Sequence, residues 1–281
     1  MEPLAVMLVL AAAVMHATWN AMVKVDDDRL MTMAVVISTT GLFAPFLLLI
    51  GPPPTPESWP YIVLSALLNN AYFLFLIEAY RFGNFSRVYP IARGSAPLLV
   101  AAGAAWFAGE NLSGGELLGV IIVSVGIISL VWGGGFRIST ENRSVIFALL
   151  TGLMIAAYTV VDGLGVRLSG NPAAYIGWLF ILSPLPLITI AIVRRRGQAL
   201  VYLKKHWRPA VLGGTLNLGS YGLSIWALSL SAMANVSALR ETSVIIAAII
   251  GTRLLNEPFG RQRIIAAAIV AAGVITIAVQ S

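Results

Sequence analysis

Long apolar stretches, separated by short polar segments, follow one another along the whole chain of 281 residues. Each stretch is continuously apolar and does not alternate with polar residues, which favours helices over the strands of a membrane barrel. A helix that crosses the ~30 Å hydrocarbon core of a bilayer needs about 20 such residues. The stretches cover residues 4–23, 30–50, 59–80, 88–108, 117–132, 145–165, 173–193, 209–230, 235–255 and 264–279. The pattern therefore predicts an all-α integral membrane protein with ten transmembrane helices.

The composition limits the classes of function. Hydrophobic residues make up 58% of the chain and charged residues 11%, with a mean hydropathy of +0.88, whereas a soluble domain carries roughly 25% charged residues. A soluble enzyme, a large domain outside the membrane and a protein with a single membrane anchor are therefore excluded. Cysteine is absent from the sequence, which excludes disulfides, thiol catalysis and thiolate metal sites, and we expect neither a cofactor nor a metal.

Positive charge gathers on one side of the predicted helices. All but three of the 18 Lys and Arg residues fall in the loops of that side. Arg167 lies on the other side, with both termini, and Arg93 and Arg240 lie within spans. Cytoplasmic loops collect Lys and Arg, so we expect both termini in the periplasm of a bacterial inner membrane. The first span has an acidic start and no small-residue cleavage site, which favours a retained helix over a signal peptide.

The two halves of the chain align at one constant offset of 147 residues. The aligned pairs are Asn70 with Asn217, Arg93 with Arg240, Ser95 with Thr242, Glu110 with Glu257, and Gly126 with Gly273. We therefore divide the chain into residues 1–133 and residues 144–281, each with five spans. Because five is odd, the second half must be inverted relative to the first. Two inverted five-helix repeats around a central cavity are a recurrent design of secondary transporters.

Several segments carry a resemblance to a known family. The first helix contains HATWNAMVK, the fourth contains YPIARGSAPLL, and Gly109–Glu110 and Asn256–Glu257 close the fourth and ninth helices. With ten spans and a five-plus-five repeat, the whole chain resembles the drug/metabolite transporter superfamily. It is most similar to the ten-helix EamA-type members and, among them, to YddG-like amino-acid exporters. The resemblance implies a secondary transporter whose first helix lines the cavity.

The same resemblance bears on the cargo and on coupling. In phosphate-transporting relatives, basic residues of the fourth and ninth helices hold the substrate anion, which implies that Arg93 and Arg240 bind an anionic group. The first helix lacks the glutamate by which the small four-helix multidrug relatives couple to protons, so their mechanism does not carry over. His16, Asp162 and Glu241 are the remaining candidates for proton carriers, since buried groups of these types titrate near neutral pH.

Polar and aromatic residues that share helix faces inside the spans are the candidate substrate-binding residues, because ionisable groups in a membrane are functional candidates by default. They are His16, Trp19, Asn20, Asn70, Tyr72, Arg93, Tyr158, Asp162, Asn217, Tyr221, Arg240 and Glu241. Structural roles compete with these assignments. Arg240 has Glu241 and Asp162 as candidate ion-pair partners, Asp162 has Arg167, and the polar face that carries Asn217 and Tyr221 could hydrogen-bond to neighbouring helices.

The sequence favours a secondary transporter over the other classes. There is no Walker phosphate loop, HExxH or GxSxG motif, so neither ATP drive nor an intramembrane enzyme is supported. We expect export of a small polar metabolite, an amino acid with an apolar or aromatic side chain, by alternating access. The alternatives are an uptake permease for another small anion such as a phosphonate, or a channel or lipid scramblase on the same fold. The expected partners are a small-molecule substrate and the lipid bilayer, without nucleic acid, and the expected functional unit is a monomer.

Overall fold

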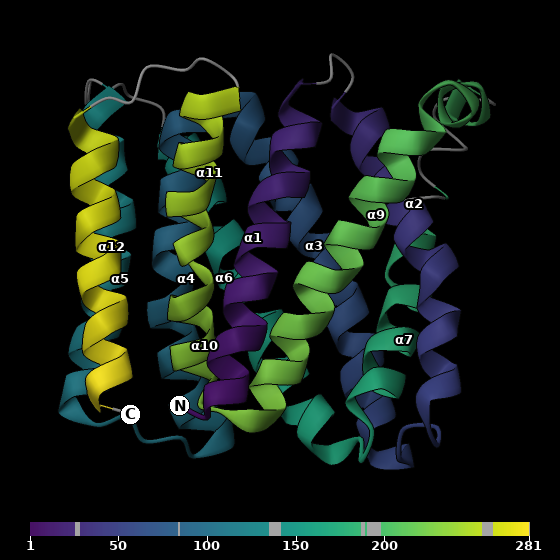
Figure 1. The fold of residues 1–281 in the computed structure, drawn as a ribbon, viewed down its shortest axis with the longest axis horizontal. Coiled ribbons are helices and arrows are strands. Elements are labelled where there is room, and N and C mark those ends of the chain that lie inside the picture. The colour runs from purple at the N-terminus through teal and green to yellow at the C-terminus, as the bar shows by residue number, and fades with distance from the viewer. Residues whose placement is uncertain are drawn as a thin grey trace.

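A computed structural model of the chain describes residues 1–25, 29–83, 85–134, 142–186, 189, 198–254 and 261–280. Throughout these ranges the secondary structure is helical, without strands. The helices run side by side as one bundle, and both chain termini lie at the same end of it (Figure 1). The structure thus agrees with the predicted all-α membrane protein.

The described helices coincide with the predicted spans, with two differences. They are α1 (Pro3–Val25), α2 (Arg29–Phe43) with η1 (Ala44–Ile50), η2 (Pro56–Ser58), α3 (Trp59–Phe82), α4 (Phe85–Ala108), α5 (Gly114–Ile128) with η3 (Ser129–Gly134), α6 (Asn142–Leu168), α7 (Pro172–Leu182), α9 (Gln198–Leu230), α10 (Met233–Arg240), α11 (Thr242–Leu254) and α12 (Arg261–Gln280). The predicted span 209–230 extends back to Gln198 through a bend at His206, where φ is −117°. The predicted span 235–255 is interrupted at Glu241, between α10 and α11.

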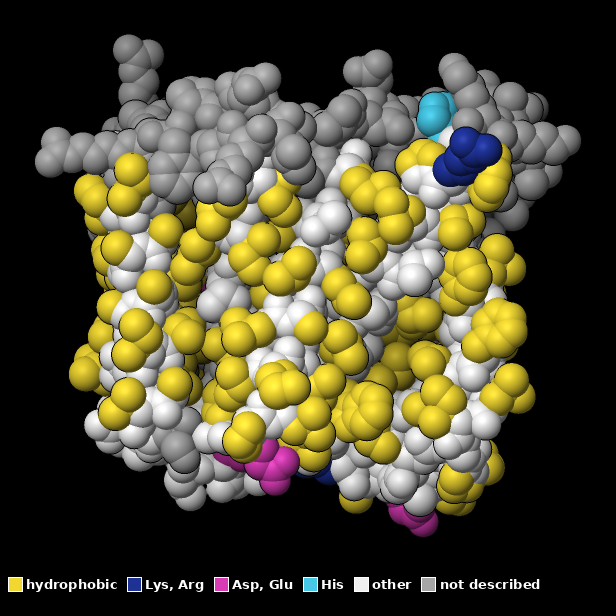
Figure 2. Space-filling view, in the orientation of Figure 1, with side chains coloured by type: hydrophobic (Ala, Val, Ile, Leu, Met, Phe, Trp, Pro, Cys, Tyr) yellow, Lys and Arg dark blue, Asp and Glu magenta, His cyan; other side chains and the backbone are white. Residues whose placement is uncertain are grey.

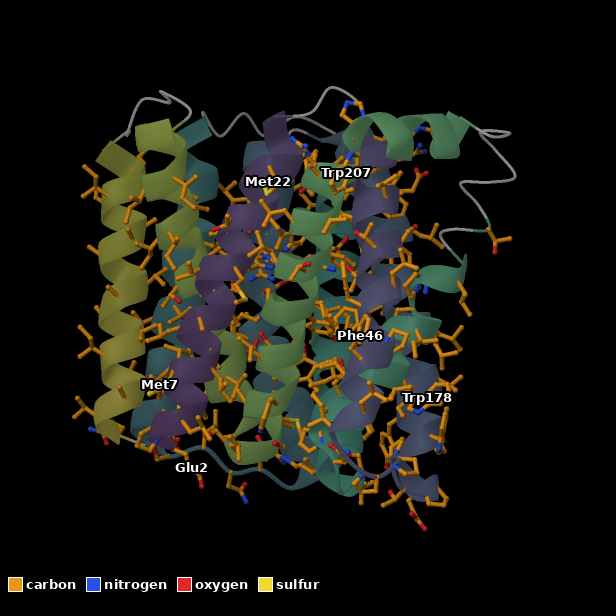
Figure 3. The ribbon with its side chains drawn as sticks, turned by 45° about the vertical axis from the view of Figure 1, so that its right-hand side comes forward. Glu2, Met7, Met22, Phe46, Trp178 and Trp207 are labelled. Carbon is orange, nitrogen blue, oxygen red and sulfur yellow. The ribbon has the colours of Figure 1, made fainter. Side chains whose placement is uncertain are left out.

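The outer surface of the bundle is apolar between its two ends. Figure 2 shows hydrophobic side chains over the middle of the visible face, with Lys and Arg near one end and Asp and Glu near the other. Large apolar side chains are exposed there, among them Trp106 at 84% and Leu49 at 82%. Trp207, at the bend in α9, lies near the end opposite to Glu2 (Figure 3). Such a surface suits contact with lipid chains.

Within the described ranges, four helical segments are each long and apolar enough to cross a membrane. They are Pro56–Phe82, Val88–Ala108, Gly114–Val131 and Arg143–Leu168. Shorter apolar helices lie beside them at Pro3–Trp19, Val35–Ile50, Pro172–Pro186 and Ile264–Gln280. The protein is therefore a multi-pass membrane protein built from helices of both kinds.

Helix packing relates the two halves. α3 of the first half packs against α6 of the second half, and their counterparts under the repeat, α9 of the second half and α1 of the first, also pack against each other. Likewise α4 packs against α6, and α10 and α11 pack against α1. The fifth helix of each half, α5 and α12, pack together. The same neighbours thus recur when the two halves are exchanged.

Glycines allow α5 and α12 to approach closely. A Cβ added at Gly273 would lie 2.8 Å from the carbonyl oxygen of Gly119 and 2.8 Å from the backbone nitrogen of Val123. Small residues at such contacts let helix backbones meet in a membrane, where packing rather than hydrophobicity drives association. Gly273, which the repeat pairs with Gly126, therefore has a role in packing α12 against α5.

We expect Gly273→Ala to lower the melting temperature of the purified protein, because overpacking a helix contact costs about 1–3 kcal/mol. Gly114→Ala is the matched control, since a Cβ there meets no atom within 4 Å. Thermal unfolding in detergent measures both variants. Equal melting of the two would show that close packing at Gly273 does not hold α5 to α12.

Candidate substrate site

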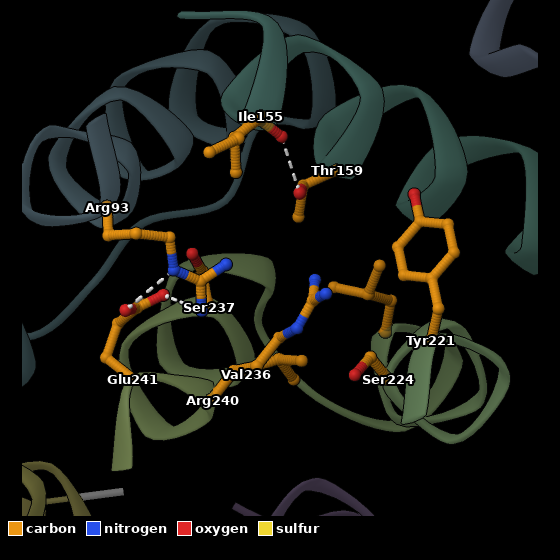
Figure 4. A pocket seen from close by; sticks show the side chains of 10 residues that line it. Arg93, Ile155, Thr159, Tyr221, Ser224, Val236, Ser237, Arg240 and Glu241 are labelled. Carbon is orange, nitrogen blue, oxygen red and sulfur yellow. Dashed lines mark hydrogen bonds and ion pairs between the residues drawn. The ribbon is translucent and has the colours of Figure 1, made fainter. Parts of the chain in front are cut away.

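A small pocket lies inside the bundle, where α4, α6, α9 and α10 meet. Its lining residues are Arg93, Ile155, Thr159, Tyr221, Ser224, Leu228, Val236, Ser237, Arg240 and Glu241 (Figure 4). The pocket encloses about 10 Å³ of free space, which is room for one water molecule. In this conformation the walls are closed around the polar groups, and a larger ligand requires them to separate.

Arg93 and Glu241 form a buried ion pair between the two halves of the chain. Arg93 Nη2 lies 2.8 Å from Glu241 Oε1, and Arg93 Nε donates to Oε2 at 3.1 Å. The side chains are 7% and 3% exposed. The contact therefore combines one hydrogen bond between charged groups with a second close approach of opposite charges. The break between α10 and α11 places Glu241 where it can reach α4.

The structure does not show the candidate pairing of Glu241 with Arg240. Side chains of consecutive helical residues point about 100° apart and do not face each other. Glu241 therefore turns to Arg93, across the bundle, while Arg240 points elsewhere in the pocket.

Arg240 is a buried cation without an anionic partner in the described part of the chain. It is 8% exposed, and its Nε has no hydrogen-bond partner there. Its guanidinium carbon lies 5.2 Å from the centre of the Tyr221 ring, a cation–π contact. Figure 4 shows the Arg240 side chain between the Arg93–Glu241 pair and Tyr221. Glu241 is thus paired with Arg93, and Arg240 is the arginine of the lining without a carboxylate at ion-pair distance among the described residues.

Asp162 lies fully buried on α6 and is held by hydroxyl groups of three other helices. Tyr175 of α7 donates to Oδ1 at 2.9 Å, Tyr221 of α9 donates to Oδ2, and Ser65 of α3 hydrogen-bonds to the same carboxylate. The candidate pairing of Asp162 with Arg167 is not formed, and Arg167 pairs with Glu110 instead. Five residues apart on one helix, the two side chains point about 140° from each other.

Aromatic rings connect the pocket to the rest of the candidate residues. The ring centres of Tyr72 and Tyr158 are 6.0 Å apart, and those of Tyr158 and Tyr221 are 5.6 Å apart, both edge to face. Phe180 of α7 packs against Tyr221 in the same way at 5.7 Å. A row of rings thus runs from α3 through α6 to α9 and gives this side of the pocket an aromatic wall.

The other candidate residues lie away from the pocket lining. On α1, the rings of His16 and Trp19 meet edge to face at 5.5 Å. Asn70 donates to the Ser183 carbonyl at 3.1 Å, and Asn217 donates to Thr40 Oγ1 at 3.4 Å. Asn70 thus connects α3 to α7, and Asn217 connects α9 to α2. For Asn217 this is the alternative structural role, a hydrogen bond to a neighbouring helix. The side chain of Asn20 lies outside the described residues.

A second polar cluster closes the end of the bundle that carries the termini. Glu110 Oε1 lies 2.6 Å from Arg167 Nη2, and its Oε2 accepts from the Met233 backbone N–H at 2.8 Å. Arg167 also donates to the carbonyls of Leu228 and Ser231, at 2.9 and 2.8 Å. These contacts fasten α6 and the end of α4 to the turn between α9 and α10. We call Glu110, Arg167 and the backbone of residues 228–233 the terminal latch; Glu257, the repeat partner of Glu110, lies outside the described residues.

Sequence patterns did not indicate several of these groups. Thr159, Ser224 and Ser237 line the pocket, yet serine and threonine are common in membrane helices, and nothing in their spacing sets them apart. Tyr175 stands in a continuously apolar run and gives no signal of its hydrogen bond to Asp162. The repeat, which pairs Glu110 with Glu257, did single out Glu110. It did not indicate that Arg167 is the ion-pair partner of Glu110.

The fold and the closed basic pocket together define a multi-pass helical carrier with a polar site inside the membrane. Comparison with known proteins agrees: the model of the EamA-like transporter family matches residues 3–132 and again residues 142–279. The chain belongs to this family, within the drug/metabolite transporter superfamily. Members of this family are transporters.

One similar plant protein supports the same placement, and one solved structure has a similar fold. A WAT1-related chloroplastic protein of Arabidopsis thaliana is 25% identical over 228 residues, which make up 77% of this chain and 54% of that protein. The match thus spans about half the length of the plant relative. A solved crystal structure of another protein has a TM-score of 0.75 and 16% identity, covering 98% of this chain and 96% of that one. At this identity the second comparison shows the fold alone.

Proposed function

We propose that this protein exports a small metabolite with one carboxylate, an amino acid with an apolar or aromatic side chain, across a bacterial inner membrane. The observation that carries the proposal is Arg240, a buried cation in the pocket without an anionic partner among the described residues. A buried charge is expensive unless something compensates it. A cargo carboxylate, held by the planar fork of the guanidinium, supplies that compensation.

The charge balance of the pocket favours a monoanionic group. Arg93 and Glu241 neutralise each other, so Arg240 matches one negative charge. A phosphonate with two negative charges would leave one of them without a counter-charge in a site of low dielectric constant. The rings of Tyr158 and Tyr221 beside the site suit an apolar or aromatic side chain.

The proposed mechanism is alternating access by inverted repeats, residues 1–133 and 144–281. Its support is the recurrence of helix neighbours when the halves are exchanged and the double match of the family model. The Arg93–Glu241 pair connects the halves at the pocket, and the terminal latch holds them together at one end. Rocking of one half against the other would open the two ends in turn. From the distribution of Lys and Arg we place both termini in the periplasm.

Export can be tested in bacterial cells that express the protein. We expect such cells to tolerate toxic amino-acid analogues at several-fold higher concentrations than cells with an empty vector, and to lose preloaded radiolabelled L-phenylalanine faster. Greater sensitivity to the analogues would indicate uptake. Faster loss that does not saturate with internal phenylalanine would indicate a channel. Unchanged tolerance and loss across a broad panel of amino acids would count against amino-acid transport.

A further inference from the structure

Two buried groups of opposite charge contact the same tyrosine. Asp162 accepts a hydrogen bond from the Tyr221 hydroxyl, and Arg240 lies over the Tyr221 ring at 5.2 Å. In the described part of the chain, neither group has an ion-pair partner, and both are under 10% exposed. Tyr221 therefore lies between a carboxylate and a guanidinium, neither of which has a partner at ion-pair distance in the described part of the chain.

The surroundings of Asp162 differ from those of an acid in a structural ion pair. Its described hydrogen-bond partners are neutral hydroxyls, of Tyr175, Tyr221 and Ser65. Hydroxyls satisfy the oxygen atoms of a carboxylate but leave its charge uncompensated. Glu241, the other buried acid of the site, already has Arg93 at 2.8 Å. Asp162 is thus the acid that can accept a cation from a ligand without losing an internal ion pair.

We infer that Asp162 and Arg240 form the two halves of one site for a zwitterion, with Asp162 binding the cargo ammonium group and Arg240 binding its carboxylate. This inference rests on the proposed function and deepens it, because it assigns a separate residue, Asp162, to the amino group of the proposed amino-acid cargo. The two charges of such a molecule are a few ångströms apart, and Tyr221 separates Asp162 from Arg240 by the width of one ring and its hydroxyl.

Tyr221 occupies the ammonium position in the closed conformation. Its hydroxyl is a donor to Asp162, as an ammonium group would be, and the pocket holds only about 10 Å³ of free space. Rotation of this side chain away from Asp162 frees one carboxylate oxygen, while Tyr175 and Ser65 keep the carboxylate oriented. The ring of Tyr221 then remains available to contact the cargo side chain.

The test compares pairs of ligands that differ only in the amino group. Binding of L-phenylalanine and 3-phenylpropanoate, and of L-leucine and 4-methylpentanoate, is measured on the purified full chain by calorimetry. We expect the wild type to bind each amino acid at least about tenfold more tightly than the matching acid. In Asp162→Asn this ratio should fall to about one, through loss of affinity for the amino acid. Arg240→Gln should weaken both members of each pair.

Tyr175→Phe is the matched control. It also removes a hydroxyl donor from Asp162, but it leaves the carboxylate charge in place, so it should keep the preference for the amino acid. Asp162→Ser serves as a second variant without the charge, with a hydroxyl that can still bond to Tyr175, and it should lose the preference as Asp162→Asn does.

The outcomes separate this inference from the proposed function. A preference that survives in Asp162→Asn or Asp162→Ser overturns the inference. Equal binding of the acids and the amino acids by the wild type also overturns the inference. In that case the proposed transport of carboxylates still stands. Failure of every ligand in the panel to bind overturns both proposals.

Discussion

Replacing Arg240 by glutamine is expected to weaken cargo binding strongly and leave the protein folded, whereas replacing Glu241 by glutamine is expected to destabilise the protein strongly. Arg240 has no ion-pair partner in the described residues, so its removal breaks no ion pair. Glu241→Gln strands Arg93 in a site where both side chains are under 10% exposed. Breaking a buried ion pair at one partner costs about 3–5 kcal/mol.

Loss of binding should be correspondingly large in Arg240→Gln. Removing one side of a buried, hydrogen-bonded charge pair costs about 2–5 kcal/mol in affinity, which is about 30-fold or more. Arg240→Lys keeps the charge and loses the planar fork, so its affinity for L-phenylalanine should lie between wild type and glutamine. The melting temperature in detergent and the affinity by calorimetry are measured on the same preparations. Together they distinguish the binding role of Arg240 from the structural role of Glu241. Early melting of Arg240→Gln with normal melting of Glu241→Gln would reverse the roles assigned here.

The architecture could be predicted from the sequence because the bilayer imposes it. Apolar length predicts where a helix crosses, and the constant offset of the repeat marked Arg93 and Arg240 as the equivalent intramembrane cations. Both line the observed pocket. The break between α10 and α11 was not predicted, because residues 235–255 read as one apolar stretch with Arg240 and Glu241 inside it.

The partners of the charged residues could not be predicted in the same way. Helical periodicity gives the face of a residue on its own helix, but the rotation of one helix relative to the next depends on packing across the whole bundle. Glu241 therefore looked like a partner of its neighbour Arg240, and the structure pairs it with Arg93, 148 positions away. Tyr175, which holds Asp162, stands among apolar residues and carries no pattern at all.

The second large expected effect is on access to the pocket, when the terminal latch is weakened by substitution. Glu110 and Arg167 hold the end of α4, α6 and the turn before α10 together through an ion pair at 2.6 Å and hydrogen bonds to backbone groups. Hydrogen bonds to charged groups contribute about 1.5–3 kcal/mol each. Because alternating access requires this end to open, loss of one such bond should shift the population toward the open state by about tenfold.

The sequence offers a clean way to measure that shift, since it has no cysteine. Ser237→Cys places one thiol in the pocket lining with a minimal change of size. A membrane-impermeant maleimide added to intact cells then reports access from the outside. Glu110→Gln and Arg167→Gln, each combined with Ser237→Cys, should be labelled about tenfold faster than Ser237→Cys alone.

Two controls decide what faster labelling means. Glu57→Gln changes an acidic residue in η2, outside the described contacts of the latch, and should leave the labelling rate unchanged. In inside-out vesicles the same reagent reaches the opposite end of the bundle, and the latch variants should then be labelled no faster, since a carrier opened at one end is closed at the other. Faster labelling in vesicles but not in cells would place the termini in the cytoplasm. Equal labelling of the latch variants and Ser237→Cys alone in both preparations would show that Glu110 and Arg167 stabilise the fold without controlling access to the pocket.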